Sequence, residues 1–143
     1  MPLRSSEETR YIRSYSDINV DFRNNPITKD IYPVRNEAAI TQSIKNLVQT
    51  RFGERLMQPT IGSNVYNMLF EPLDVFSGIE LQDRIFRTIK NYERRVEVQE
   101  VSVAIMDDED SAIVVVTYRI IGEPQLIKNQ FILERPSSWN QQI

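Results

Sequence analysis

The sequence predicts an α+β fold in which about three helices pack on a small, mainly antiparallel C-terminal sheet. Apolar residues recur with a helical period between residues 36 and 92, and with a strand period between residues 96 and 134. The turns between the strand patterns are short, and short turns join antiparallel neighbours into a meander. The 143 residues suffice for one ordinary domain.

We expect that domain to span residues 15–134. Residues 1–14 are polar and charged without a period, as in a flexible end or in an arm that becomes ordered on a neighbouring chain. Residues 135–143 form a polar tail with Trp139, which either docks on its own domain or anchors a partner.

Two short strands are expected before the first helix. Apolar and polar residues alternate over residues 18–22, and Pro26 then breaks the pattern. The segment 31–34 predicts a brief edge strand, because Pro33 lacks the backbone donor that a central strand needs.

The first helix is expected to begin at Asn36, a suitable N-cap, with Glu37 in its first turn and Gly53 as its terminator. A second, short helix is expected from a cap at Ser63 to about Leu69. The apolar stripe of the first helix consists of Ile40, Ile44, Leu47 and Val48.

The third helix is expected to start at Ser77, because Ser77 and Glu80 have the spacing of a capping box. Its buried side is expected to contain Leu81, Ile85, Phe86, Ile89 and Tyr92.

Three strand patterns follow. The parity of the apolar residues switches near Gln99, which predicts a β-bulge there. An acidic turn, 107–111, leads to residues 112–121, whose β-branched residues indicate the central strand. Residues 125–134 form the last strand, with one side made of Ile127, Phe131 and Leu133.

Composition excludes several kinds of site. The chain has no Cys and no His, which removes disulfides, Cys or His zinc sites and Ser-His-Asp triads. The acidic turn lacks the Gly and Glu of a calcium loop, and the four glycines are too scattered for a phosphate loop. We expect no cofactor, no metal and no signal peptide. The net charge of −3 and the absence of a long apolar run argue against nucleic acid and membrane as partners.

The junction between the third helix and the sheet concentrates charge at Glu93, Arg94 and Arg95. Partly buried charges need partners, so Glu93 and Arg95 either form a structural ion pair with each other or bind another chain. Arg84 and Arg87 share the polar side of the helix with Arg94; this side is either simply solvated or faces an acidic partner helix.

The last strand carries few charges that would discourage pairing with other strands. Either the segment 31–34 or the tail covers it, or it accepts a strand from another chain. Its candidate binding residues are Leu126, Ile127, Lys128, Asn129, Gln130, Phe131, Ile132 and Leu133.

A catalytic alternative is glycan hydrolysis, which needs two carboxylates. No spacing in the sequence marks an acid and a nucleophile. The carboxylates available in the helical half are Glu54, Glu71, Asp74 and Glu93.

Five short stretches, taken in their order and spacing, resemble the small baseplate wedge proteins of contractile-tailed phages, which also initiate the tail sheath. A type VI secretion baseplate subunit is similar. At the junction the family carries Glu-Pro-Arg; Glu93 and Arg95 match, whereas Arg94 replaces the proline. The matching stretches are Tyr15–Ile18, Thr50–Arg55, Pro59–Gly62, Leu69–Pro72 and Tyr92–Val96.

The resemblance implies a non-enzymatic structural subunit of the virion, assembled into the tail baseplate in the host cytoplasm. The larger wedge proteins would bind the junction and the helix face, through Glu93, Arg94, Arg95, Arg84 and Arg87. The tail sheath subunit would add strands to the last strand. Some members of the family have been labelled lysozymes, so glycan hydrolysis stays as the alternative.

Overall fold

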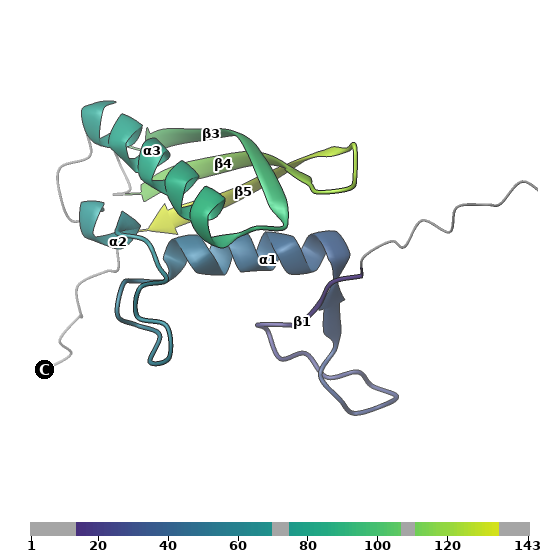
Figure 1. Ribbon diagram of the computed structural model, residues 1–143. Helices are drawn as coiled ribbons and strands as arrows, with labels where there is room; N and C mark the ends of the chain where they lie inside the picture. Colours follow the sequence, from purple (N-terminus) through teal and green to yellow (C-terminus); the bar gives the residue numbers. More distant parts are fainter. Residues whose placement is uncertain (1–13, 70–74, 107–110, 135–143) are drawn as a thin grey trace, which may run out of the picture. The chain divides into compact units, whose positions relative to one another are not determined.

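The computed structural model describes residues 14–69, 75–106 and 111–134 (Figure 1). The chain divides into two compact units, Met1–Ala39 and Ile40–Ile143. Trp139 and most of the acidic turn lie outside the described residues.

The N-terminal unit contains a two-stranded antiparallel sheet of β1 (Ser16–Ile18) and β2 (Pro33–Arg35). The predicted strands are present but displaced, because the backbone already turns at residues 19–22, where Phe22 N donates to Asn19 O at 3.1 Å. β2 pairs with β1, so the predicted edge strand is satisfied within this unit.

Helix α1 (Asn36–Gln49) begins at the predicted residue. Asn36 has a φ of 50°, and its Oδ1 accepts a hydrogen bond from Tyr15 N at 3.2 Å, so its side chain joins the helix start to the residue directly before β1. The predicted stripe is buried throughout. Gly53 does not end the helix; its φ of 82° belongs to the loop that follows.

Helix α2 (Val65–Met68) starts after Ser63, whose Oγ donates to Val48 O and so joins the end of α1 to the start of α2. Helix α3 (Val75–Tyr92) begins before Ser77, so the predicted capping box was wrong. Glu80 lies inside the helix instead and pairs with Arg84.

Of the residues predicted for the buried side of α3, Leu81, Ile85 and Ile89 are fully buried, whereas Phe86 is half-buried. Tyr92 differs: it is 39% exposed, and its hydroxyl donates to Thr60 O at 2.8 Å. At the last turn of the helix the amphipathic tyrosine therefore meets a loop rather than the core.

The sheet consists of β3 (Val96–Met106), β4 (Ser111–Ile120) and β5 (Leu126–Glu134), in the order β3-β4-β5 and antiparallel throughout. The meander, the central position of β4 and the bulge, here between Val98 and Glu100, confirm the prediction.

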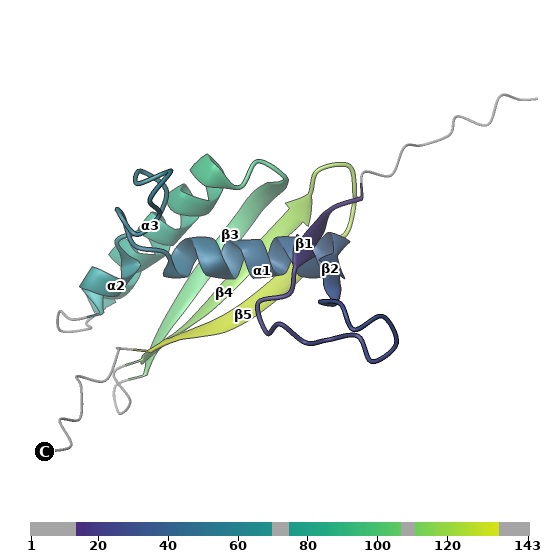
Figure 2. The same ribbon diagram turned by 90° about the horizontal axis from the view of Figure 1, so that it is seen from below.

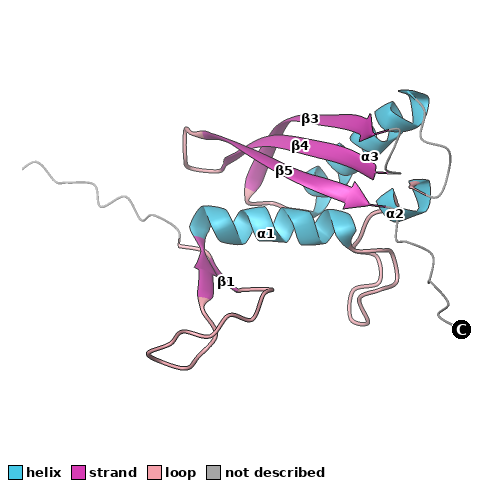
Figure 3. Ribbon diagram, turned by 180° about the vertical axis from the view of Figure 1, so that it is seen from behind, coloured by secondary structure: helices cyan, strands magenta, loops and turns pink. Residues whose placement is uncertain are grey.

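Both long helices lie on one face of this sheet (Figures 2 and 3). From α1, Thr41 Oγ1 lies 2.8 Å from Tyr118 Oη in β4. From α3, Gly78 packs so closely on Ile105 of β3 that an added Cβ would lie 3.1 Å from its Cδ1. The helices thereby bury the inward residues of the strands and leave the other face open within the described part of the chain.

Candidate functional site

The helix-to-strand junction is held by a bidentate ion pair. Arg95 Nε donates to Glu93 Oε1 at 2.7 Å, and Arg95 Nη2 donates to Glu93 Oε2 at 2.6 Å. Only 5% of Glu93 is exposed, and 30% of the Arg95 side chain. A planar guanidinium matches a carboxylate in this arrangement, which fixes geometry as well as charge.

The buried carboxylate also has a partner on α1, because Ser43 Oγ donates to Glu93 Oε2 at 2.8 Å. Burial raises the pKa of Glu93, but the hydrogen bonds from Arg95 and Ser43, together with the charge of Arg95, outweigh it. The pKa of Glu93 therefore lies below its ordinary value, and the carboxylate stays ionised.

Of the two alternatives for Glu93 and Arg95, the structure contains the ion pair within the chain. Arg94 points elsewhere: it is exposed and makes no hydrogen bond or ion pair with a described residue. The three neighbouring charges thus divide into a structural pair and one outward cation.

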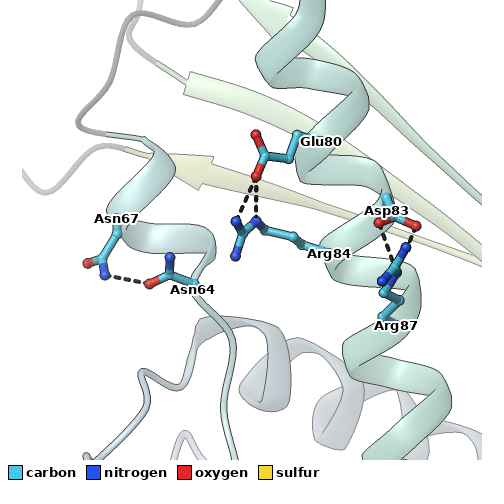
Figure 4. Close-up of polar contacts among 6 residues, drawn as sticks. All are labelled: Asn64, Asn67, Glu80, Asp83, Arg84 and Arg87. Carbon is cyan, nitrogen blue, oxygen red and sulfur yellow. Dashed lines mark hydrogen bonds and ion pairs between the residues drawn. The ribbon is translucent and has the colours of Figure 1, made fainter.

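The expected basic face of α3 is neutralised along the helix (Figure 4). Arg84 Nη2 lies 2.6 Å from Glu80 Oε1, and Arg87 Nε lies 2.9 Å from Asp83 Oδ2. Both are i,i+4 pairs on an exposed surface, where each contributes a few tenths of a kcal/mol. The face carries paired charges, so it offers an acidic partner less attraction than Arg94 does.

The second candidate site is the outer edge of β5. Among the described residues, β5 has a neighbouring strand on one side only, which is β4. Of the two predicted covers for this edge, the segment 31–34 pairs elsewhere: Pro33 and Val34 pair with β1, and Ile31 forms a bridge with Asn24. The tail, 135–143, lies outside the described residues.

The register shows which backbone groups of β5 face outward. Ile121 N donates to Arg95 O at 3.0 Å, so odd-numbered residues along β4 point their N–H and C=O groups to β3. Even-numbered residues then point to β5, where Val116 pairs with Asn129. Consequently the N–H and C=O groups that face away from β4 belong to Leu126, Lys128, Gln130, Ile132 and Glu134.

Of the four carboxylates suggested for glycan hydrolysis, the structure describes Glu54 and Glu93. The lowered pKa of Glu93 is opposite to what a general acid requires. Glu54 Oε2 accepts from Arg51 N at 2.8 Å within a loop. Glu71 and Asp74 lie outside the described residues.

Within the described residues, no cluster of three acidic side chains has the geometry to hold a metal ion. None of the described helices is long and apolar enough to cross a membrane.

Sequence reasoning missed the role of Ser43 in the junction. Ser43 lies beside the buried stripe of α1, directly before Ile44, and a small hydroxyl there is a recognisable signal for a polar contact in the core. Its partner Glu93 is 50 residues away, a distance that no local pattern spans.

We expect Arg95→Ala to lower the free energy of unfolding by about 3 kcal/mol, because it leaves a buried carboxylate without its charged partner. Urea denaturation measures the change. Arg94→Ala is the matched control and should stay within about 0.5 kcal/mol of the unmodified chain. Equal effects of the two substitutions would contradict a structural role for the pair.

Glu93 should also make stability depend on acid pH. The contribution of ionised Glu93 to the free energy of unfolding is complete above its ordinary pKa. It is lost as the pH falls through the lower pKa that Glu93 has in the folded state. The neutral variant Glu93→Gln lacks the ionised form at every pH. The difference in unfolding free energy between the two chains should therefore shrink between about pH 7 and about pH 3. A difference that stays constant in a series of urea titrations would refute this linkage.

A model of the family of baseplate wedge protein gp25 matches residues 34–125. The baseplate wedge protein gp25 of Enterobacteria phage T4 is 27% identical over 124 residues, which cover 87% of this chain and 92% of that protein.

Solved structures share the fold. A crystal structure from Geobacter sulfurreducens, provisionally described as a tail lysozyme, has a TM-score of 0.65 at 18% identity, over 72% of this chain and 94% of its own. A chain of the anti-feeding prophage baseplate has a TM-score of 0.59 at 18% identity, over 83% and 84%. At these identities, the similarity to the two structures supports a shared fold and nothing further. The family match and the phage relative confirm the resemblance: this chain belongs to the gp25 family of baseplate wedge proteins and is a structural component of a contractile tail.

Proposed function

We propose that this subunit docks on larger baseplate wedge proteins through the junction around Arg94, and that it initiates the tail sheath by accepting strands at β5. Both steps would take place during virion assembly in the host cytoplasm. The observation that carries the proposal is the outer edge of β5, where five residues direct their N–H and C=O groups away from β4.

Docking at the junction is supported by the rigidity of the turn and the exposure of its middle residue. Glu93 N donates to Ile89 O at 2.9 Å, so helical bonding continues to the turn, and Glu93 holds Arg95 in place. Arg94 extends from this turn as a cation without a partner among the described residues. A fixed backbone lowers the entropy lost when such a side chain binds.

Within this proposal the junction residues have different roles. Glu93 is too buried to touch a partner and acts by positioning Arg95 and the turn. Arg84 and Arg87 contribute contacts at the rim of the surface, where paired, exposed charges add little affinity. Arg94 supplies the principal charged contact, most favourably to a carboxylate of the partner.

Strand addition at β5 suits the start of a repeating polymer. Main-chain hydrogen bonds supply affinity with little demand on side-chain identity, and alternate side chains supply specificity. Leu126 and Ile132 are 57% and 49% exposed on the open face of the sheet, so they are available for apolar contact with an added strand. A ladder loaded along several residues also provides a tether that survives contraction of the sheath.

We propose that the chain has no enzymatic activity. The most buried carboxylate among the described residues, Glu93, is committed to an ion pair and kept ionised, which suits a structural role and not proton donation. The description of the Geobacter sulfurreducens structure as a tail lysozyme applies to that protein, and no feature of the described residues favours hydrolysis here.

Arg94→Ala should weaken binding to the purified larger wedge proteins by about tenfold, as expected for an exposed arginine anchor. Isothermal titration calorimetry at low salt measures this directly. The control is Arg119→Ala, which removes an arginine from the sheet, where it pairs with Glu97. Unchanged affinity of the Arg94 variant would remove the junction from the docking surface.

Gln130→Pro should abolish seeding of sheath polymerisation, because it removes an outward N–H of β5 while keeping the ladder to β4. The lag time of polymerisation of the sheath protein, followed by light scattering, is the readout. Asn129→Pro is the matched control: it removes an inward N–H and lowers unfolding stability by about 1 kcal/mol or more. Normal seeding by a folded Gln130 variant would refute strand addition at this edge.

A further inference from the structure

After the junction and the edge of β5, a third surface feature is the loop between α1 and α2, residues 50–63. Hydrogen bonds within the loop hold its backbone in place. At its base Ser63 N donates to Thr50 O at 2.8 Å. Across the loop Gly53 N donates to Pro59 O at 2.8 Å. Gly62 permits the two ends to meet, because a Cβ there would lie 2.8 Å from the carbonyl carbon of Arg51.

Side chains at the base add further contacts. Glu54 accepts from Arg51 N, and the Arg51 guanidinium lies 5.0 Å from the centre of the Tyr66 ring. Tyr92 anchors the loop to the end of α3 through Thr60 O. Together these contacts fix a loop that projects away from α1 and α2 (Figures 1 and 3).

The tip of this loop is apolar and almost completely exposed. Leu56 is 96% exposed and Met57 is 95% exposed, the highest values among the large apolar side chains described. Neighbouring Arg55 is also exposed and has no side-chain partner among the described residues. These two adjacent apolar side chains contribute no burial free energy to folding, so that free energy becomes available only when another surface covers them.

We propose that Leu56 and Met57 form an anchor that inserts into an apolar pocket, bordered by acidic groups, on another protein of the baseplate wedge. The anchor is convex, so its complement is a pocket. Unbranched, polarizable Met adapts to an irregular apolar lining. Arg55 sets the charge of the border, because a cation beside a buried anchor favours a carboxylate opposite it.

A second copy of this chain fits less well, because two convex tips do not bury one another. The bracing also has a consequence for affinity: an anchor already fixed in position loses little conformational entropy on binding, so most of its burial is available as binding free energy. The choice of a wedge protein as partner rests on the proposed function, whereas the anchor itself rests on exposure and bracing.

The test is binding of the full chain to the purified larger wedge proteins, measured by calorimetry. The double substitution Leu56→Ser and Met57→Ser should weaken binding by about 100-fold, since two anchor side chains lose their burial. The exchange Leu56→Met with Met57→Leu keeps the apolar volume and should retain affinity within about threefold. Arg55→Glu should weaken binding by about tenfold at low salt and less at high salt.

These substitutions leave the fold intact, because the side chains are exposed; thermal unfolding verifies it. Unchanged affinity of the double serine variant, while Arg94→Ala weakens binding, would overturn the anchor and leave the proposed docking standing. If the double serine variant loses affinity and Arg94→Ala does not, the anchor is supported and Arg94 is not part of the docking surface. If the unmodified chain dimerises with increasing concentration and the double serine variant does not, the tip binds a second copy and the proposal is overturned. The proposal is also overturned if the unmodified chain does not bind the wedge proteins.

Discussion

The rest of the C-terminal unit depends on one buried carboxylate. Glu93, directly after α3, accepts hydrogen bonds from Arg95, directly before β3, and from Ser43 on α1. A desolvated charge is costly unless it is fully partnered, so these three elements must come together in one arrangement. Arg95 O then accepts from Ile121 N, which carries the same constraint into the register of the sheet.

This arrangement separates charges that hold the fold from groups that remain open on the surface of the described residues. The ion pair removes Glu93 and Arg95 from the surface chemistry and leaves Arg94 outward. The register likewise commits half of the backbone groups of β5 to β4 and leaves the alternate set open. Such a division suits a structural subunit, because its exposed polar groups lie on a framework that is already satisfied internally.

Periodicity predicted the elements whose burial decides their conformation. The stripe of α1, the three-stranded meander and the bulge before Glu100 all follow from where apolar residues recur. Signals at the ends of helices were less reliable. Ser77 and Glu80 have the spacing of a capping box, but α3 begins at Val75, so both residues lie inside the helix, where Glu80 pairs with Arg84 one turn later.

The sequence by itself determined the fold class, the core and the absence of Cys and His chemistry, because these depend on composition and on short-range periodicity. Only the tertiary structure decided that Glu93 is hydrogen-bonded to Ser43 and that the even-numbered residues of β5 direct their backbone groups outward. It also decided that Leu56 and Met57 are exposed to solvent on a braced loop. These facts depend on contacts between residues distant in the chain and on hydrogen-bond parity across strands, and local patterns encode neither.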